Sequence, residues 1–220
     1  SSSLCEKLLK FARKSNIEME IINVHESIAN VGDIIKHSFD KRIKLNLGLA
    51  AQTHFIRGNS ASLENALLNL AINAKDAMPN GGLLSITTKN ITYLTQKTTE
   101  QEIIPSGKYI QVNVEDQGVG MNKDVKEHLF EPFFTTKDVG KGTGLGLPSA
   151  YGVFKQHKGY VNVDSKLGKG TTFKIHLPVE IDKNQGKKQG KKVKKALNNK
   201  NAQTNKKILY IEDDPNMLQA

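Results

Sequence analysis

The chain has 220 residues, a formal net charge of +10 and one cysteine, Cys5. This length predicts one good-sized domain with appendages, and the lone cysteine excludes an internal disulfide, which agrees with a reducing, cytoplasmic compartment. No apolar run reaches the roughly 18–20 residues that span a bilayer. Because the chain begins at Ser1 rather than at methionine, we expect a fragment of a longer protein, which could itself be membrane-anchored.

The positive charge is concentrated near the C-terminus. Residues 182–207 hold ten lysines and one acid, Asp182, so nine of the ten net charges lie there and the rest of the chain is close to neutral. A nearly neutral body lacks the basic face of a nucleic-acid-binding domain, and we expect no nucleic-acid partner. The lysine-rich stretch is poor in apolar residues, so we interpret residues 182–206 as a flexible linker. A tether for nucleic acid or acidic lipid is the alternative.

The first half of the chain predicts helices and strands in alternation. Residues 2–14 have apolar side chains near helical spacing and indicate the C-terminal part of a helix. Residues 18–24 alternate weakly, as in an edge strand, and residues 43–49 alternate clearly. Two further helices are predicted. The one over 25–39 has its apolar face formed by Ile28, Val31, Ile34, Ile35 and Phe39, and the one over 60–78 is capped by Ser60 or Ser62.

The second half predicts a sheet and two more helices. Strands are expected over 83–92, 109–115, 160–165 and 171–178, with a polar loop over 94–107 and helices near 122–129 and over 145–157. We expect an α/β fold, a two-layer sandwich of a mixed β-sheet with helices on one face. Residues 207–212 predict one more strand, followed by Asp213 and Asp214, which would start a second domain.

A polar stripe follows the longest predicted helix. Asn65, Asn69 and Asn73 are four residues apart and share one face with Asp76, while Leu63, Leu67, Leu70, Ala74 and Met78 take most of the opposite face. Asparagine is a poor helix former, so the stripe is either an exposed or hydrogen-bonded face or a ligand site. Amide oxygens suit Mg²⁺, which takes few protein ligands and fills its shell with water and phosphate.

Three further segments contain residues suited to a nucleotide. Asp116 ends a strand before Gly118 and Gly120, where a carboxylate could accept a hydrogen bond from the amino group of adenine but would face a carbonyl of guanine. Residues 130–137 combine three phenylalanines with Thr-Thr-Lys, as in a hinged lid with an apolar anchor. Residues 140–147 are rich in glycine and lead into a helix, an arrangement that favours phosphate.

The order and spacing of these segments resemble the GHKL ATP-binding fold, specifically its histidine-kinase branch. The N box looks like Asn69-Leu-Ala-Ile-Asn73-Ala-Lys-Asp76-Ala, and the G1 box looks like Asp116-Gln-Gly118-Val-Gly120. The F box looks like residues 130–137, and the G2 box looks like Gly142-Thr-Gly144-Leu-Gly146-Leu. A last family element is similar to Gly168-Lys-Gly170-Thr171-Thr-Phe173. The resemblance covers residues 17–180.

The resemblance implies a set of ligand contacts. It implies ATP with its adenine on Asp116, near Thr171, and Mg²⁺ between Asn73 and the phosphates, with Lys141 as a further phosphate contact. The implied ATP-binding residues are Asn69, Asn73, Asp76, Asp116, Gly118, Gly120, Thr136, Lys137, Gly142, Thr143, Gly144, Leu145, Gly146, Leu147 and Thr171.

Asn69 is the candidate catalytic residue. It stands where ATPase relatives place a general-base glutamate, and an amide cannot act as that base, so the resemblance implies phosphoryl transfer to a histidine rather than hydrolysis. Many histidine kinases have Lys-Tyr where this chain has Asp76-Ala77. The pattern here resembles the nitrogen-regulator branch, in which Asp76 would hold a water on the metal.

The flanking segments imply the domain order of a hybrid kinase. Residues 1–16 resemble the end of a dimerisation helix, residues 17–181 the ATP-binding catalytic domain, and residues 207–220 the truncated start of a receiver domain. None of the six histidines lies in an acceptor box, so we expect a chain that binds ATP without phosphorylating itself. Its expected partners are its own upstream dimerisation and phosphoacceptor domain and a receiver domain, downstream or in a response regulator. The fragment should be a monomer and the full-length protein a homodimer.

Two other functions stay open at this point. A GHKL ATPase or serine-kinase regulator would hydrolyse ATP by itself, and Asn69 argues against it. A binding module, either a degenerate kinase or a nucleic-acid binder, would show no ATP affinity, or a steep salt dependence of nucleic-acid binding that disappears when residues 183–207 are deleted.

Overall fold

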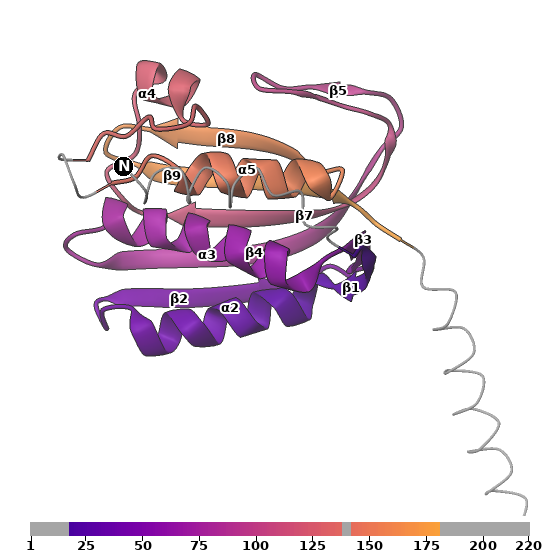
Figure 1. Cartoon of the computed structure of the whole chain (residues 1–220), viewed down its shortest axis with the longest axis horizontal. Coiled ribbons are helices and arrows are strands. Elements are labelled where there is room, and N and C mark those ends of the chain that lie inside the picture. The colour runs from indigo at the N-terminus through magenta and orange to yellow at the C-terminus, as the bar shows by residue number, and fades with distance from the viewer. Residues whose placement is uncertain (1–17, 138–141, 181–220) are drawn as a thin grey trace, which may run out of the picture. The chain divides into compact units, whose positions relative to one another are not determined.

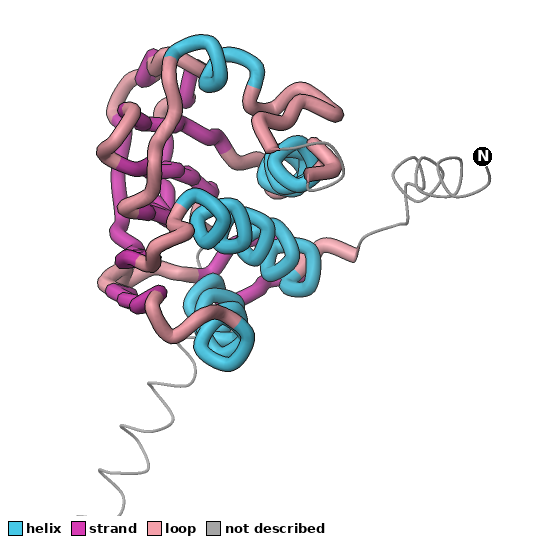
Figure 2. The backbone as a smooth tube through the Cα atoms, turned by 90° about the vertical axis from the view of Figure 1, so that its left-hand side faces the viewer, coloured by secondary structure: helices cyan, strands magenta, loops and turns pink. Residues whose placement is uncertain are grey.

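The computed structural model describes residues 18–137 and 142–180, which form a layer of strands and a layer of helices (Figure 1). The five-stranded sheet has the order β2 (Ile43–Leu49), β4 (Gly82–Tyr93), β7 (Gly107–Asp116), β9 (Gly170–Pro178) and β8 (Tyr160–Lys166). Strands β2 and β4 are parallel, and the other neighbours are antiparallel. Figure 2 shows the helices together on one side of the strands. The predicted fold class is confirmed.

Each long helix buries one stripe against the sheet. Helix α2 (Val24–Ser38) buries Val24, Ile28, Val31 and Ile35, which recur at helical spacing. Ile34 was predicted on the same face but is 43% exposed. Six residues of α-helix turn the side chain by about 600°, so Ile34 points about 120° away from Ile28 and lies off the buried stripe. Helix α3 (Ser60–Ala77) lies between α2 and α5 (Gly146–Gln156) and buries its predicted apolar face completely. The sheet's inner face completes the core with Leu84, Ile86, Val112, Val114, Phe173, Ile175 and Leu177.

Two short pairs of strands were not predicted. Strand β1 (Glu20–Asn23) does not join the edge of the main sheet but pairs with β3 (Phe55–Gly58), which is too short to show alternation. The segment predicted as a polar loop over 94–107 contains a hairpin of β5 (Lys97–Thr98) and β6 (Ile103–Ile104). Its buried residue, Ile104, is 1% exposed.

The cap of α3 differs from the prediction. The N-cap is Asn59, whose side chain accepts a hydrogen bond from the backbone N–H of Ser62 at 2.9 Å. The backbone N–H of Asn59 donates to Nε2 of His157 at 3.0 Å, and Nδ1 of His157 lies 2.8 Å from the carbonyl of Val153. His157 is the C-cap of α5 and is buried. The start of α3 and the end of α5 are therefore joined through one imidazole ring.

Several predictions lie outside the described residues. These are the dimerisation helix over 1–16, the linker over 182–206, the receiver start over 207–220, and the role of Lys141. Within residues 18–137 and 142–180, no helix combines the length and the apolar character needed to cross a membrane.

Substitution of the α3 cap should lower stability. We expect Asn59→Ala to reduce the free energy of unfolding by about 1 kcal/mol, because the N–H of Ser62 loses its acceptor. Ser60→Ala is the matched control and should stay within about 0.5 kcal/mol of wild type, as substitutions away from caps and core do. Urea denaturation measures both. Equal losses in the two variants would show that Asn59 is not the cap that matters.

Candidate functional site

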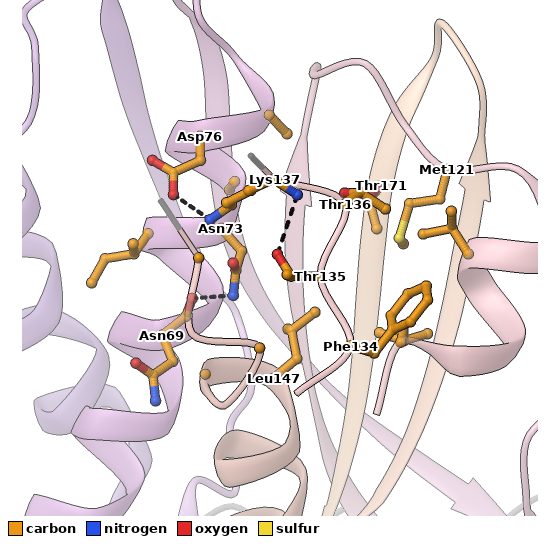
Figure 3. Close-up of a pocket in the computed structure, with 18 of the residues that line it drawn as sticks. Asn69, Asn73, Asp76, Met121, Phe134, Thr135, Thr136, Lys137, Leu147 and Thr171 are labelled. Atoms are coloured by element: carbon orange, nitrogen blue, oxygen red, sulfur yellow. Dashed lines mark hydrogen bonds and ion pairs between the residues drawn. The ribbon is translucent and has the colours of Figure 1, made fainter. Parts of the chain in front are cut away.

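A cleft of about 450 Å³ lies between helices α3, α5 and α4 (Lys123–His128) and the ends of β7 and β9 (Figure 3). This volume is within the range of small-molecule sites. Residues of all four predicted boxes line it. Thirteen of the fifteen predicted ligand residues are among them, namely Asn69, Asn73, Asp76, Asp116, Gly120, Thr136, Lys137, Gly142, Thr143, Gly144, Gly146, Leu147 and Thr171. Gly118 and Leu145 are not lining residues.

One end of the cleft is polar. Nδ2 of Asn73 donates to the backbone carbonyl of Asn69 at 2.9 Å, one turn earlier in α3. That bond leaves the amide oxygen of Asn73 as its remaining polar atom. Nζ of Lys137 lies 2.6 Å from Oδ2 of Asp76, and Figure 3 shows this ion pair beside Asn73. Asn65, predicted on the same helix face, is exposed and does not line the cleft.

These polar residues fit a hard divalent cation. The amide oxygen of Asn73 and the carboxylate of Asp76 lie on one helix face, and oxygen atoms of these types are the ligands that Mg²⁺ prefers. The ammonium of Lys137 contacts Asp76 directly, and that of Lys75 lies 3.5 Å from its other oxygen. Asp76 therefore already stands in an environment that holds positive charge. Within the described residues, no cluster of three or more His, Cys, Asp or Glu forms a metal site made of protein ligands alone.

The cleft also contains a buried carboxylate, that of Asp116. Asp116 is 5% exposed, and its Oδ1 accepts a hydrogen bond from the backbone N–H of Gly118 at 2.8 Å. Burial raises the pKa of Asp116, while the backbone N–H groups of Gly118 and Thr171 act in the opposite direction. In the sheet register Asp116 is the direct partner of Thr171, as the sequence implied.

Apolar side chains also line the cleft, and sequence reasoning did not single out most of them. Met121, Val125, Leu129 and Phe173 line the cleft together with Phe134 of the F box. Figure 3 shows Met121 and Phe134 at the end away from Asp76. Two local signals were available: Val125 and Leu129 are one helical turn apart, and Phe173 alternates inward with Ile175. The cleft thus combines an apolar slot, lined by these side chains, with one buried hydrogen-bond acceptor, the carboxylate of Asp116.

The F-box and G2-box segments contact each other through their backbones. The N–H of Phe133 donates to the carbonyl of Gly144 at 2.9 Å. Gly144 has φ +62, and a side chain there would overlap the backbone of Phe133, so glycine is required for this approach. Gly146 and Leu147 begin α5 and line the cleft, so the free N–H groups of this helix start open beside it. Such a helix start attracts anions.

Comparison with known proteins identifies the same region. Residues 58–181, more than half of the chain, match the family described as Histidine kinase-, DNA gyrase B-, and HSP90-like ATPase. The sensor kinase CckA of Brucella abortus (strain 2308) is 36% identical over 219 residues, which are 97% of this chain and 23% of that protein. Sporulation kinase E of Bacillus subtilis (strain 168) is 31% identical over 178 residues, which are 80% of this chain and 22% of that protein. The chain thus spans about a quarter of the length of these curated relatives.

Solved structures show the same fold. The catalytic domain of histidine kinase ThkA, in a nucleotide-free form, superposes with a TM-score of 0.59 at 24% identity and covers 74% of this chain and 96% of that one. The mycobacterial sensor histidine kinase MprB gives a TM-score of 0.58 at 23% identity over 74% of this chain and 98% of that one.

Stability should depend on pH through Asp116. The pKa of Asp116 in the folded state is raised above the ordinary value of 3.8. Between the pKa of the unfolded state and this raised pKa, the folded state still holds a proton that the unfolded state has lost. The free energy of unfolding therefore falls as pH rises through that range. We expect Asp116→Asn to gain free energy of unfolding relative to wild type as pH rises from about 4 and to reach a plateau above the raised pKa.

Urea denaturation of the ligand-free chain at a series of pH values measures this difference. The control is Asp33→Asn at an exposed position of α2, which should show no comparable gain. A difference for Asp116→Asn that is constant with pH, or that shrinks as pH rises, would contradict a raised pKa.

Proposed function

Because the chain belongs to the histidine kinase-, DNA gyrase B- and HSP90-like ATPase family, we propose that it is the ATP-binding catalytic domain of a sensor histidine kinase. In this proposal the γ-phosphoryl group of ATP is transferred to a histidine of a dimerisation domain outside the chain. The observation that carries the proposal is one cleft that combines two kinds of surface. A buried carboxylate and apolar side chains line it, together with a group of amide, carboxylate and ammonium side chains.

The apolar end is suited to adenine. A carboxylate acceptor at Asp116 would take a hydrogen bond from the exocyclic amine, and Met121, Leu129 and Phe134 offer apolar surface to the ring. Guanine has a carbonyl oxygen in place of that amine, so two acceptors would face each other at a position that water reaches poorly. The slot should therefore favour ATP over GTP. Burial of Asp116 makes the discrimination larger, because an unpaired acceptor costs more when desolvated.

The polar end is suited to the triphosphate and its Mg²⁺. Mg²⁺, when bound, would neutralise phosphate charge and bridge phosphate oxygens. Asn73 would offer its amide oxygen to the cation, and Asp76 would hold a water on it. Lys137 reaches this region from the F box, and the first residues of α5 present free N–H groups. Thr136 and Thr143 also line the cleft.

Asn69 favours phosphoryl transfer over hydrolysis. Asn69 lines the cleft one turn before Asn73, and the resemblance places it where ATPase relatives have the glutamate that activates water. An amide cannot accept a proton at neutral pH, so water in this position is not activated. The attacking group would then come from outside the chain, which agrees with a histidine acceptor on a separate domain.

The wider architecture remains part of the proposal. We infer residues 1–16 to be the end of a dimerisation helix, 17–181 the catalytic domain, 182–206 a flexible linker and 207–220 the start of a receiver domain. The kinase would be of the nitrogen-regulator-like hybrid type. Its partners would be its own phosphoacceptor domain and a receiver, in a cytoplasmic setting and without nucleic acid. The full-length protein would be a homodimer.

Calorimetry with a non-hydrolysable ATP analogue and Mg²⁺ tests the site. Wild type should bind this analogue in preference to the GTP analogue. Asp116→Ala and Asn73→Ala should each lose about tenfold or more in affinity, since a hydrogen bond to a charged partner contributes about 1.5–3 kcal/mol. Asn65→Ala is the matched control, because Asn65 belongs to the same helix stripe but lies outside the cleft. Wild type that binds neither nucleotide would overturn the proposal.

Transfer of labelled phosphate to an added dimerisation domain tests the reaction. We expect phosphorylation of the acceptor histidine to require the chain, ATP and Mg²⁺ together, while the chain alone releases phosphate at the background rate. Rapid hydrolysis by the chain alone, without transfer, would instead identify a GHKL ATPase.

A further inference from the structure

The hairpin of β5 and β6 makes contacts that none of the four boxes explains. It lies in the segment between β4 and β7 and extends beyond the sheet on the side of β8 (Figure 1). β8 is the last strand of the main sheet, and its backbone N–H at Val163 donates to Oε1 of Gln101 at 3.4 Å. Oε2 of Glu100 accepts from Nζ of Lys126 in α4 at 2.7 Å. The hairpin tip is thus tied to both β8 and α4.

The strongest contacts of the hairpin are those of Glu102. Its side chain is 9% exposed. Oε1 accepts from the hydroxyl of Tyr151 at 2.8 Å, and Oε2 accepts from Nζ of Lys155 at 2.6 Å, so both carboxylate oxygens bind to α5. Oxygen atoms of a carboxylate that is nearly removed from water form strong, charge-assisted hydrogen bonds. Burial and the bond to Glu102 raise the pKa of Tyr151 to about 12, so its hydroxyl keeps the proton that it donates.

Tyr151 connects this carboxylate to the cleft wall. It lies one helical turn after Leu147, a lining residue of α5. Its ring stacks on Phe130, with ring centres 4.4 Å apart and an angle of 27° between the planes. Phe130 is the first residue of the F-box segment, residues 130–137. In the sequence it follows Leu129 directly and precedes Phe134 by four residues, and both of these line the cleft. The chain of contacts therefore runs from Glu102 through Tyr151 and Phe130 to the wall.

We propose that Glu102 is a positioning residue for nucleotide binding, which acts through Tyr151 and Phe130 on the F-box segment. This inference rests on the proposed function. The hydrogen-bond partners of the Glu102 side chain within residues 18–137 and 142–180 are Tyr151 and Lys155, and neither is a lining residue of the cleft. The bond from the Tyr151 hydroxyl to Glu102 holds the Tyr151 ring in place, and Phe130 stacks on that ring. The position of Phe130 in turn sets the direction of the chain that carries Thr135, Thr136 and Lys137. Affinity for the triphosphate then depends on a hairpin that is distant in sequence from the boxes.

A comparison of two ligands tests the proposal. Calorimetry of the full chain with adenosine and with the β,γ-imido analogue of ATP, in Mg²⁺, gives the ratio of their affinities. Glu102→Ala and Tyr151→Phe should each lower the affinity for the ATP analogue by about three- to tenfold, because both remove the charge-assisted bond between Glu102 and Tyr151. Adenosine should be affected less, because it lacks the phosphates that the end of the F-box segment would meet. The ratio should therefore fall.

Two further variants separate positioning from general damage. Glu102→Gln retains an oxygen that accepts from Tyr151 and should restore most of the ratio. The double variant Glu102→Ala/Tyr151→Phe should lose no more affinity for the ATP analogue than the more affected single variant, because both substitutions break the same bond between Glu102 and Tyr151. Asp33→Ala, at an exposed carboxylate of α2, is the matched control and should leave both affinities unchanged. Should Glu102→Ala fail to fold, Tyr151→Phe, which removes one oxygen atom, provides the test.

Hydrogen exchange of the ligand-free chain gives an independent readout. The amides of Glu131, Phe133 and Phe134 are bonded to the carbonyls of His128, Gly144 and Glu131. They should exchange faster in Tyr151→Phe, while the amides of α2 stay as in wild type. An unchanged affinity ratio together with unchanged exchange would overturn the inference. Wild type that binds neither ligand would overturn the proposed function, and the exchange experiment would then decide the positioning role alone.

Discussion

Backbone segments approach each other closely where β7 ends, and the base of the cleft depends on that approach. A Cβ at Gly170 would overlap the carbonyl oxygen of Asp116, and one at Gly118 would lie 2.6 Å from the carbonyl oxygen of Ala77 in α3. Without side chains at these two positions, β9 and the end of α3 can close over Asp116. The same approach removes water from the carboxylate, raises its pKa and leaves backbone N–H groups as its partners. The charge properties of the site therefore depend on the close backbone packing that the two glycines allow.

Helix α3 carries both the core and the polar end of the cleft. Its leucine face is fully buried between α2, α5 and the sheet, so its position is held by apolar packing. Its other face can then hold asparagines, which are poor helix formers, since the packed face supplies the stability that they do not. The carbonyl of Ala77 also accepts the backbone N–H of Val119 at 3.0 Å. The end of one helix therefore holds Asp76 and also contacts the turn that follows Asp116.

Periodicity and glycine spacing carried most of the fold prediction, because both are local properties of the chain. The leucine face of α3, the alternation of β2, β4, β7, β8 and β9, and the layer arrangement follow from repeats of 3.6 and 2 residues. The thirteen predicted ligand residues that line the cleft were named from the resemblance of four short segments to known boxes, and the packing of the helices on the sheet brings those segments together. Local pattern could not find Met121 as a lining residue, because an apolar side chain looks the same in a core and in a ligand cleft.

The sequence by itself determined the element types, the fold class and the four segments of the site, since these depend on neighbours a few residues apart. Only the tertiary structure decided which capping side chain works at α3, where Asn59 also meets His157, 98 residues away. It alone decided the contacts of the hairpin, where Glu102 binds Tyr151 across 49 residues. Contacts at such separations are made when layers pack and registers form, and a pattern read within one segment contains no information about its distant partner.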